Sequence, residues 1–334
     1  MRKERIVFEA FVAVVLVLVI LTGCKKKETS GDFVLKVGYG GGLCEAALHI
    51  AQEKGFFAEE GLNIELTRIA AGTHFEALAA GRIDASFALL ASIIQTLVNG
   101  LPGKITTGLH TGCDVVMVKS DSPITKHTDL RGKKVGIPSM MGSPTVYTKR
   151  VLADNGVDIR AETSEVEFVI YNATDLPLVL ENGSVDAIAM NDVAATIAAK
   201  EYGFRILLDS AIDEPYKDQY CCVAFVSNRL VEKNRDIAER YTRAMQKAGD
   251  YVDKNQEEVA RIQIEKNYVA GNIETNTEVL KKFKYMPSVN GAYDMFLITA
   301  RQLQQIGILS QDIDVEVLQK NSFTFFDGLD PQYK

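Results

Sequence analysis

Apolar positions along the chain follow two spacings in turn. Short apolar runs over 34–39 and 134–137 are typical of strands. A helix with one apolar face is predicted over about 43–57, from Leu43, Ala47, Ile50 and Ala51. Strands that alternate with helices form βαβ units and parallel sheets. The pattern therefore predicts an α/β fold.

One helix–turn–strand segment occurs twice. Residues 76–85 and 178–187 share leucine, glycine, aspartate and alanine at an offset of 102 residues. In each copy a glycine, Gly81 or Gly183, stands where a helix ends and a buried strand follows. Each copy is also preceded by a strand and a helix of its own. We therefore predict two similar lobes, with one ligand site between them beyond the carboxyl ends of the strands.

The first residues indicate export. Residues 1–5 are basic and 6–21 are apolar except for Glu9, which together predict a signal peptide over 1–23. A membrane-spanning helix is the alternative, but the apolar run is shorter than the roughly 20 residues of a usual span and carries a charge. The tetrapeptide that ends at Cys24 resembles a bacterial lipobox, in which the cysteine is lipidated. The polar segment 24–32 would then be a lipidated tether, and the protein extracytoplasmic and anchored to a bacterial membrane.

Charge and cysteine content narrow the function classes. The formal net charge is −7, and no basic face for nucleic acid is evident. Besides Cys24, four cysteines remain, too few for a disulfide framework: Cys44, Cys113, Cys221 and Cys222. They are interpreted as small buried hydrophobic residues. Alternatively, they line one region with His110, Met140 and Met141 and bind Cu(I) or Zn²⁺. No metal-motif spacing is present, so neither a metal nor a cofactor is predicted.

Several segments resemble one known family, the periplasmic-type binding proteins for nitrate, taurine, aliphatic sulfonates and thiamine-pyrimidine precursors (NMT1-like). The resembling segments are 50–57 with 60–65, then 72–73 with 77–78 and 81–84, and further on 129–136 and 183–187. The resemblance implies a type II periplasmic-binding-protein fold, with two parallel-rich sheets joined by two crossover strands. Lobe 1 would comprise 33–112 and 221–334, and lobe 2 would comprise 113–220. A helical stripe near the C-terminus is interpreted as core: Ala238, Tyr241, Met245, Ala248 and Val252.

The resemblance also implies a function without covalent chemistry. The protein would be a monomeric receptor that closes its cleft on a small molecule and delivers it to the permease and ATPase subunits of an ABC importer. One alternative is a metal-binding or sensory receptor on the same scaffold. Another is an enzyme similar to the thiamine-pyrimidine synthases. Such an enzyme needs a reactive cysteine or histidine cluster, for which Cys221-Cys222 is the only indication.

Candidate ligand contacts follow from the strand ends. In lobe 1 the glycine-rich loop and the next helix terminus would offer backbone N–H groups. Thr73 would cap a helix or face the ligand. His110 would donate from the cleft floor or serve a structural role. The lobe 1 and crossover candidates are Gly41, Gly42, Leu43, Cys44, Thr73, His74, Leu90, Ala91, His110, Thr111 and Tyr220.

In lobe 2 a helix opened by Pro144 would offer an anion or carbonyl site. The candidates there are Ser139, Met140, Gly142, Ser143, Asn172, Asn191 and Asp192. The candidate loops contain no lysine or arginine, and Asp192 would repel an anion or accept a hydrogen bond from an amine. We therefore expect a neutral or amine-bearing organic ligand rather than nitrate or a sulfonate.

Overall fold

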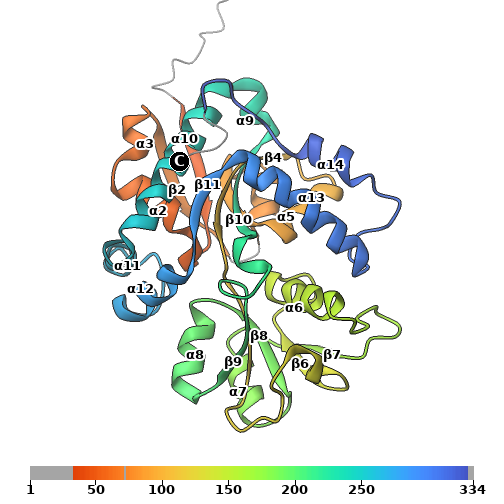
Figure 1. Ribbon diagram of the computed structural model, residues 1–334. Helices are drawn as coiled ribbons and strands as arrows, with labels where there is room; N and C mark the ends of the chain where they lie inside the picture. The colour runs from red at the N-terminus through yellow and green to blue at the C-terminus, as the bar shows by residue number, and fades with distance from the viewer. Residues whose placement is uncertain (1–32, 71–72, 330–334) are drawn as a thin grey trace, which may run out of the picture. The chain divides into compact units, whose positions relative to one another are not determined.

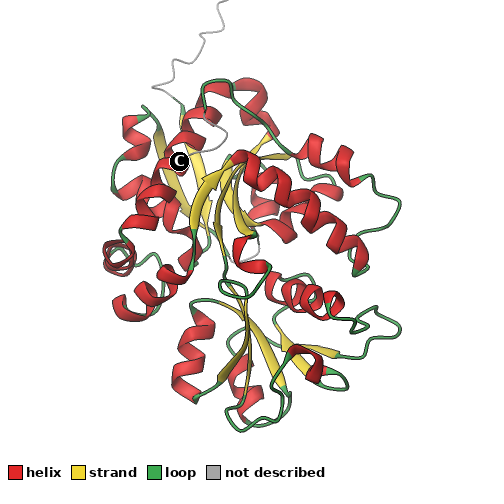
Figure 2. Cartoon of the chain, in the orientation of Figure 1, coloured by secondary structure: helices red, strands yellow, loops and turns green. Residues whose placement is uncertain are grey.

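The computed structural model describes residues 33–70 and 73–329. Its strands form two separate sheets, with helices packed around each (Figures 1 and 2). The α/β class is thereby confirmed. The predicted signal peptide over 1–23, the tether over 24–32 and the lipidation site Cys24 lie outside the described residues. In the part of the chain that is described, no helix has both the length and the apolar character needed to cross a membrane.

The first sheet has six strands. Their spatial order is β11 (Tyr285–Ser288), β4 (Gly103–Thr111), β10 (Tyr220–Ser227), β3 (Ala85–Leu89), β1 (Val34–Tyr39) and β2 (Asn63–Arg68). Strand β1 pairs in parallel with β2 and β3, as its βαβ units require. Strand β10 pairs antiparallel with β3 and β4, and β11 pairs antiparallel with β4.

The second sheet has five strands. Their order is β7 (Glu167–Ile170), β6 (Lys134–Ile137), β8 (Ala187–Asn191), β5 (Asp114–Val118) and β9 (Arg205–Asp209). Parallel pairing again joins the βαβ strands, β6 with β7 and β8. Strand β5 pairs antiparallel with β8 and β9, because the chain enters this sheet at β5 without a crossover helix. Both sheets are therefore mixed.

The chain passes between the sheets twice. It leaves β4 and enters β5 through Gly112 and Cys113, whose φ angles are +86° and +97°. It returns from β9 to β10 through residues 210–219, which include the short 3₁₀ helix η3 (Tyr216–Asp218). The predicted lobe boundaries, after 112 and after 220, lie at these connections. As a division into domains they stay a prediction.

The helices cover both sheets. Those before β5 are η1 (Leu43–Glu45), α2 (Ala46–Glu53), α3 (Phe56–Glu59), α4 (His74–Ala79) and α5 (Leu90–Val98). The second sheet carries η2 (His127–Leu130), α6 (Ser143–Asp154), α7 (Leu176–Glu181) and α8 (Ala194–Tyr202). After β10 come α9 (Asn228–Lys233), α10 (Arg235–Lys254), α11 (Gln256–Glu265), α12 (Ile273–Lys282), α13 (Val289–Gln305) and α14 (Val315–Ser322).

The repeated segment forms the same hydrogen bonds in both sheets. The turn glycines have φ angles of +69° and +75°, which a glycine adopts without strain. The Asp84 amide donates to the Lys36 carbonyl at 2.7 Å, and the Asp186 amide donates to that of Lys134 at 2.9 Å. The side chains of the same aspartates accept from the amides of Lys36 and Lys134 at 3.2 and 2.9 Å. The aspartate thus joins two strands in each copy.

Helix α10 contributes the predicted apolar stripe to the core. Its five members are all fully buried, which confirms the prediction: Ala238, Tyr241, Met245, Ala248 and Val252. The helix packs against α2, α3 and β11. Burying a large apolar side chain stabilises a fold by about 1.5–3 kcal/mol. This helix therefore holds the C-terminal part of the chain on the first sheet.

Candidate functional site

A large cavity opens between loops of the two sheets. It has a volume of about 770 Å³, within the usual range for small-molecule sites. The loops that follow β1, β6 and β8 contribute to it, together with helix α5. The carboxyl ends of strands from both sheets therefore meet at one cleft, as the sequence predicted.

The glycine-rich loop is occupied by a side chain of the same chain. The Glu45 carboxyl group accepts hydrogen bonds from the amides of Gly40, Gly41 and Gly42 at 2.6, 2.7 and 2.9 Å. Successive N–H groups of this kind form an anion-binding nest. Burial, with the Cys44 thiol adding to it, raises the pKa of Glu45 to about 8 against the opposing effect of the three amides. In either protonation state its oxygens fill the position that an oxoanion would need.

Two buried aspartates lie in lobe 2: Asp192 lines the cleft, and Asp114 lines a separate small hollow. Asp114 accepts from the Ser143 hydroxyl at 2.6 Å and from the Asn191 amide at 2.7 Å. Asp192 lines the cleft and accepts from the backbone N–H of Thr196 at 2.9 Å. Burial raises the pKa of both carboxyl groups. Lobe 2 therefore also faces the cleft with acceptor oxygens.

His74 adds a neutral acceptor. The Ser86 hydroxyl donates to the Gly38 carbonyl at 2.8 Å, so it accepts from Nδ1–H of His74 at 2.9 Å. This assignment of the ring protons leaves Nε2 with a lone pair. Burial lowers the pKa of His74 to about 4, which keeps the ring neutral at physiological pH. The ring of Phe87 lies edge-on to His74 with centroids 5.3 Å apart.

Helix α5 presents a polar stripe to the cleft. The lining members are Ser92, Gln95, Thr96 and Asn99, spaced at three and four residues as on one face of a helix. The opposite side of α5 is apolar and buried, so the polar stripe stands out on an otherwise hydrophobic helix. Among the described residues that line the cavity, none is lysine or arginine.

Half of the candidate positions lie at this cleft. The structure brings together Gly41, Gly42, Cys44, His74, Ser139, Gly142, Ser143, Asn191 and Asp192. Gly142, which lines the cavity, is the N-cap of α6 and provides no side-chain cap for the first N–H groups of that helix. The roles of these nine candidate residues as ligand contacts stay predictions.

The other candidates lie elsewhere. Leu43 is buried, and the Thr73 hydroxyl donates to the Ala70 carbonyl at 2.8 Å instead of capping α4. Leu90, Ala91 and Tyr220 line a separate hollow of about 30 Å³ at the crossing. His110 and Thr111 are fully buried. Met140 is 42% exposed and lines a different surface hollow, and the exposed Asn172 donates to Asp175 at 3.1 Å.

Sequence reasoning missed several residues that line the cleft. The most consequential are Glu45, Phe75, Phe87, Gln95, Thr96 and Asn99. A signal existed for α5, because its polar residues recur at helical spacing. No signal pointed to Glu45, since its position depends on how the glycine loop folds back.

Comparisons with known proteins define the class. The periplasmic aliphatic sulphonate binding protein SsuA from Escherichia coli matches with a TM-score of 0.73 and 17% identity, over 90% of this chain and 96% of that one. At this identity the likeness shows the fold alone. The chain thus has the fold of the periplasmic binding proteins, with the cleft between its two sheets.

Two curated relatives are more similar in sequence. A 4-amino-5-hydroxymethyl-2-methylpyrimidine phosphate synthase from Aspergillus parasiticus is 26% identical over 221 residues, 62% of each chain, so the match spans less than two thirds of that enzyme. A putative aliphatic sulfonates-binding protein from Bacillus subtilis is 23% identical over 290 residues, 82% of this chain and 84% of the relative. The family model described as NMT1/THI5 like matches residues 45–259, and the chain belongs to this family.

Proposed function

We propose that this protein is an extracytoplasmic receptor that binds a small organic molecule in the cleft and delivers it to the permease and ATPase of an ABC importer. The fold supports a receptor, since its relatives include binding proteins for sulfonates. Closure of two lobes on a ligand needs no covalent step and shifts a population toward the closed state. We propose further that the receptor acts as a monomer.

The ligand is uncharged or cationic and rich in hydrogen-bond donors. The observation that carries this proposal is the excess of acceptors in the cleft: Glu45 fills the nest, Asp192 lines the same cleft, and His74 contributes a neutral nitrogen. None of the described lining residues is lysine or arginine, although Lys282, which is not among them, lies 3.8 Å from Asp192 Oδ2. Phe75 and Phe87 add aromatic surface, on which a planar ring packs well. An aminopyrimidine has these properties, whereas a sulfonate lacks them.

Isothermal titration with matched ligands tests the proposal. We expect aminopyrimidines and benzylamine to bind more tightly than benzenesulfonate, taurine or nitrate. In the variant Asp192→Asn, affinity for the cationic ligand falls on the order of 10- to 100-fold, as for loss of a charge-assisted hydrogen bond. Asp175→Asn, an exposed position outside the cleft lining, serves as the matched control. Tighter binding of the sulfonate would refute this ligand class.

Anchoring is tested separately. If Cys24 is lipidated, the full chain partitions into the detergent phase of Triton X-114, and Cys24→Ser remains in the aqueous phase. Mass measurement of the N-terminal peptide identifies the lipid. An unmodified Cys24 in the detergent-extracted protein would contradict the anchor without affecting the ligand proposal.

A second candidate function is an enzyme similar to the pyrimidine phosphate synthase. The observation that favours it is a group of thiols and one imidazole near the cleft floor, formed by Cys44, His110 and Cys222. Formation of a pyrimidine product by the purified chain would support this function. Ligand binding without turnover supports the receptor.

A further inference from the structure

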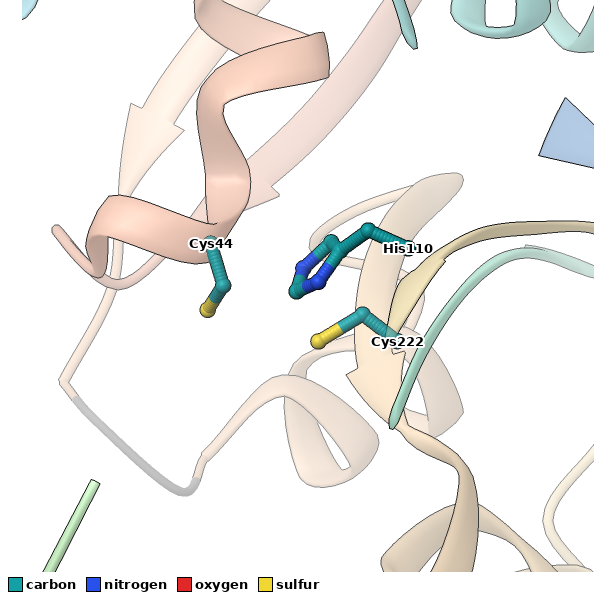
Figure 3. Close-up of side chains that lie close together, drawn as sticks. All are labelled: Cys44, His110 and Cys222. Atoms are coloured by element: carbon teal, nitrogen blue, oxygen red, sulfur yellow. The ribbon is translucent and has the colours of Figure 1, made fainter. Parts of the chain in front are cut away.

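Five side chains with soft donor atoms gather where the chain crosses between the sheets. The Sγ atoms of Cys44 and Cys222 and a ring nitrogen of His110 lie within 4.8 Å of one another (Figure 3). A second group shares Cys222 and adds Cys113 and Cys221, with the three Sγ atoms again within 4.8 Å. All four cysteines are free thiols. Their spacing in the sequence follows no metal motif, so only the fold brings them together.

Strand pairing explains this convergence. Cys222 of β10 is the register partner of His110 of β4, and the register shifts on both sides of Cys222. Such a bulge lets neighbouring side chains approach the same place, so both Cys221 and Cys222 reach the group. Cys113 has a φ of +97°, an unusual backbone angle for a residue other than glycine. Cys44 arrives from the short helix η1 after the glycine loop.

His110 is already oriented as a metal ligand. Its Nδ1 lies 2.9 Å from the Thr111 carbonyl oxygen, which can only accept, so Nδ1 carries the proton. This leaves the lone pair on Nε2, which is buried and has no hydrogen-bond partner within the described chain. A buried polar atom without a partner destabilises the fold, and a bound metal ion would remove that cost. Metal-binding histidines characteristically donate their second nitrogen to a carbonyl in this way.

The donor distances and thiol chemistry also fit a metal. Tetrahedral zinc with Zn–S bonds of about 2.3 Å places its donor atoms about 3.5–3.8 Å apart. Donors within 4.8 Å therefore need to move inward by about an ångström. The thiolate form is the one that binds metals.

We propose that Cys44, His110 and Cys222 bind one thiophilic metal ion, Zn²⁺ or Cu(I), at the floor of the cleft. Two thiolates and one imidazole are donors that both ions accept. Cys44 also lines the cleft, so three protein ligands leave a coordination position open toward the cavity. Cys113 and Cys221 supply the nearest additional thiols. The site stands whether or not the cleft takes the organic ligand proposed above.

Metal titration of the full chain tests the site. The protein is purified with a reductant, stripped with a chelator, and titrated with Zn²⁺, with Co²⁺ as a spectroscopic probe, or with Cu(I) held by a competing chelator. We expect one ion per chain by native mass spectrometry, a rise in Tm, and thiolate-to-cobalt charge-transfer absorption. Comparison of the Zn²⁺ and Cu(I) titrations shows which ion binds more tightly.

Variants locate the ligands. Cys44→Ser changes a half-buried residue and leaves the strands intact; it should lower metal affinity by at least about 100-fold and remove the charge-transfer band. Cys222→Ser and His110→Gln should do the same, with circular dichroism as the check on folding. His127→Gln replaces a histidine that belongs to neither group, so it is the matched control for His110→Gln and retains binding. The proposal is overturned by no stoichiometric binding of either ion, by full binding in Cys44→Ser, or by a disulfide at Cys222 in protein isolated without reductant.

Discussion

Replacing Glu45 with alanine should expose the anion nest and weaken the fold. The Glu45 carboxyl group accepts three backbone hydrogen bonds of 2.6–2.9 Å, and its side chain is almost completely buried. A hydrogen bond contributes about 0.5–1.5 kcal/mol when both groups are neutral, as for a protonated Glu45, and about 1.5–3 kcal/mol when one group is charged. The cost of burying the carboxyl group offsets part of the energy of these three hydrogen bonds. In the variant, water from the cleft would reach the three exposed amides and replace part of the lost hydrogen bonding. We therefore expect Glu45→Ala to lower the free energy of unfolding by about 2–3 kcal/mol.

The same variant should acquire anion binding that the parent lacks. Formate, acetate or sulfate can occupy the vacated nest, because three N–H groups then converge on an empty position. An anion at ten times its Kd would restore about 1.4 kcal/mol. Urea unfolding with and without 100 mM anion, at constant ionic strength, measures both effects. Glu76→Ala removes one exposed carboxylate from α4 and is the matched control.

Two results would refute this reasoning. If Glu45→Ala unfolds within about 0.5 kcal/mol of the parent, as most surface substitutions do, the three hydrogen bonds contribute nothing net. If the variant loses stability but no anion restores any of it, the loop does not keep its nest conformation without Glu45. Either result would also remove the main argument against an oxoanion ligand.

The remaining predictions concern stability and closure. Burial, with nearby Arg68, lowers the pKa of His49 to about 3; the unfolded chain binds a proton near 6.5, so stability falls as pH drops below that value. The loss is about 2 kcal/mol at pH 5, and urea unfolding of His49→Gln should lack this part. In Gly249→Ala the new Cβ would lie 2.5 Å from Cγ of Pro287, which costs about 1–3 kcal/mol and is relieved by Pro287→Ala in the same chain. Arg150 donates a hydrogen bond from α6 to Gln302 of α13 at 2.8 Å. Arg150→Met should destabilise the protein by about 2 kcal/mol and increase the radius of gyration measured by small-angle scattering. An unchanged radius would contradict a role of Arg150 in holding the lobes together.

Local patterns predicted the fold well because each element carries its own signal. The apolar stripe on α10 identified a core helix, and the two copies of the glycine–aspartate turn identified two similar sheets. The mixed pairing was not predicted, because the direction of a crossing strand depends on the partner that it finds in the other half of the chain. Periodicity reports which residues are buried together but not which strands become neighbours.

The site could be predicted only where strand ends define it. Ser139, Gly142, Ser143, Asn191 and Asp192 were found because they follow strands of the second sheet. The polar stripe of α5 was missed because its face toward the cleft depends on how the helix packs. The thiol–imidazole group was an open alternative, since the joining of Cys44 with Cys222 depends on a bulge in β10 that no local sequence pattern reveals.

The first loops of the two sheets, after β1 and after β6, correspond in the fold but differ chemically. The loop after β1 is closed by Glu45, whereas the corresponding loop after β6 ends at Gly142, the N-cap of a helix with no side-chain cap. A molecule held between them therefore meets the acceptor oxygens of Glu45 on one side and, next to Asp192, a helix terminus without a side-chain cap on the other. Such a cleft has a direction. A ligand with distinct ends would enter it in one orientation, which would fix the end that faces outward when the lobes reopen at the transporter.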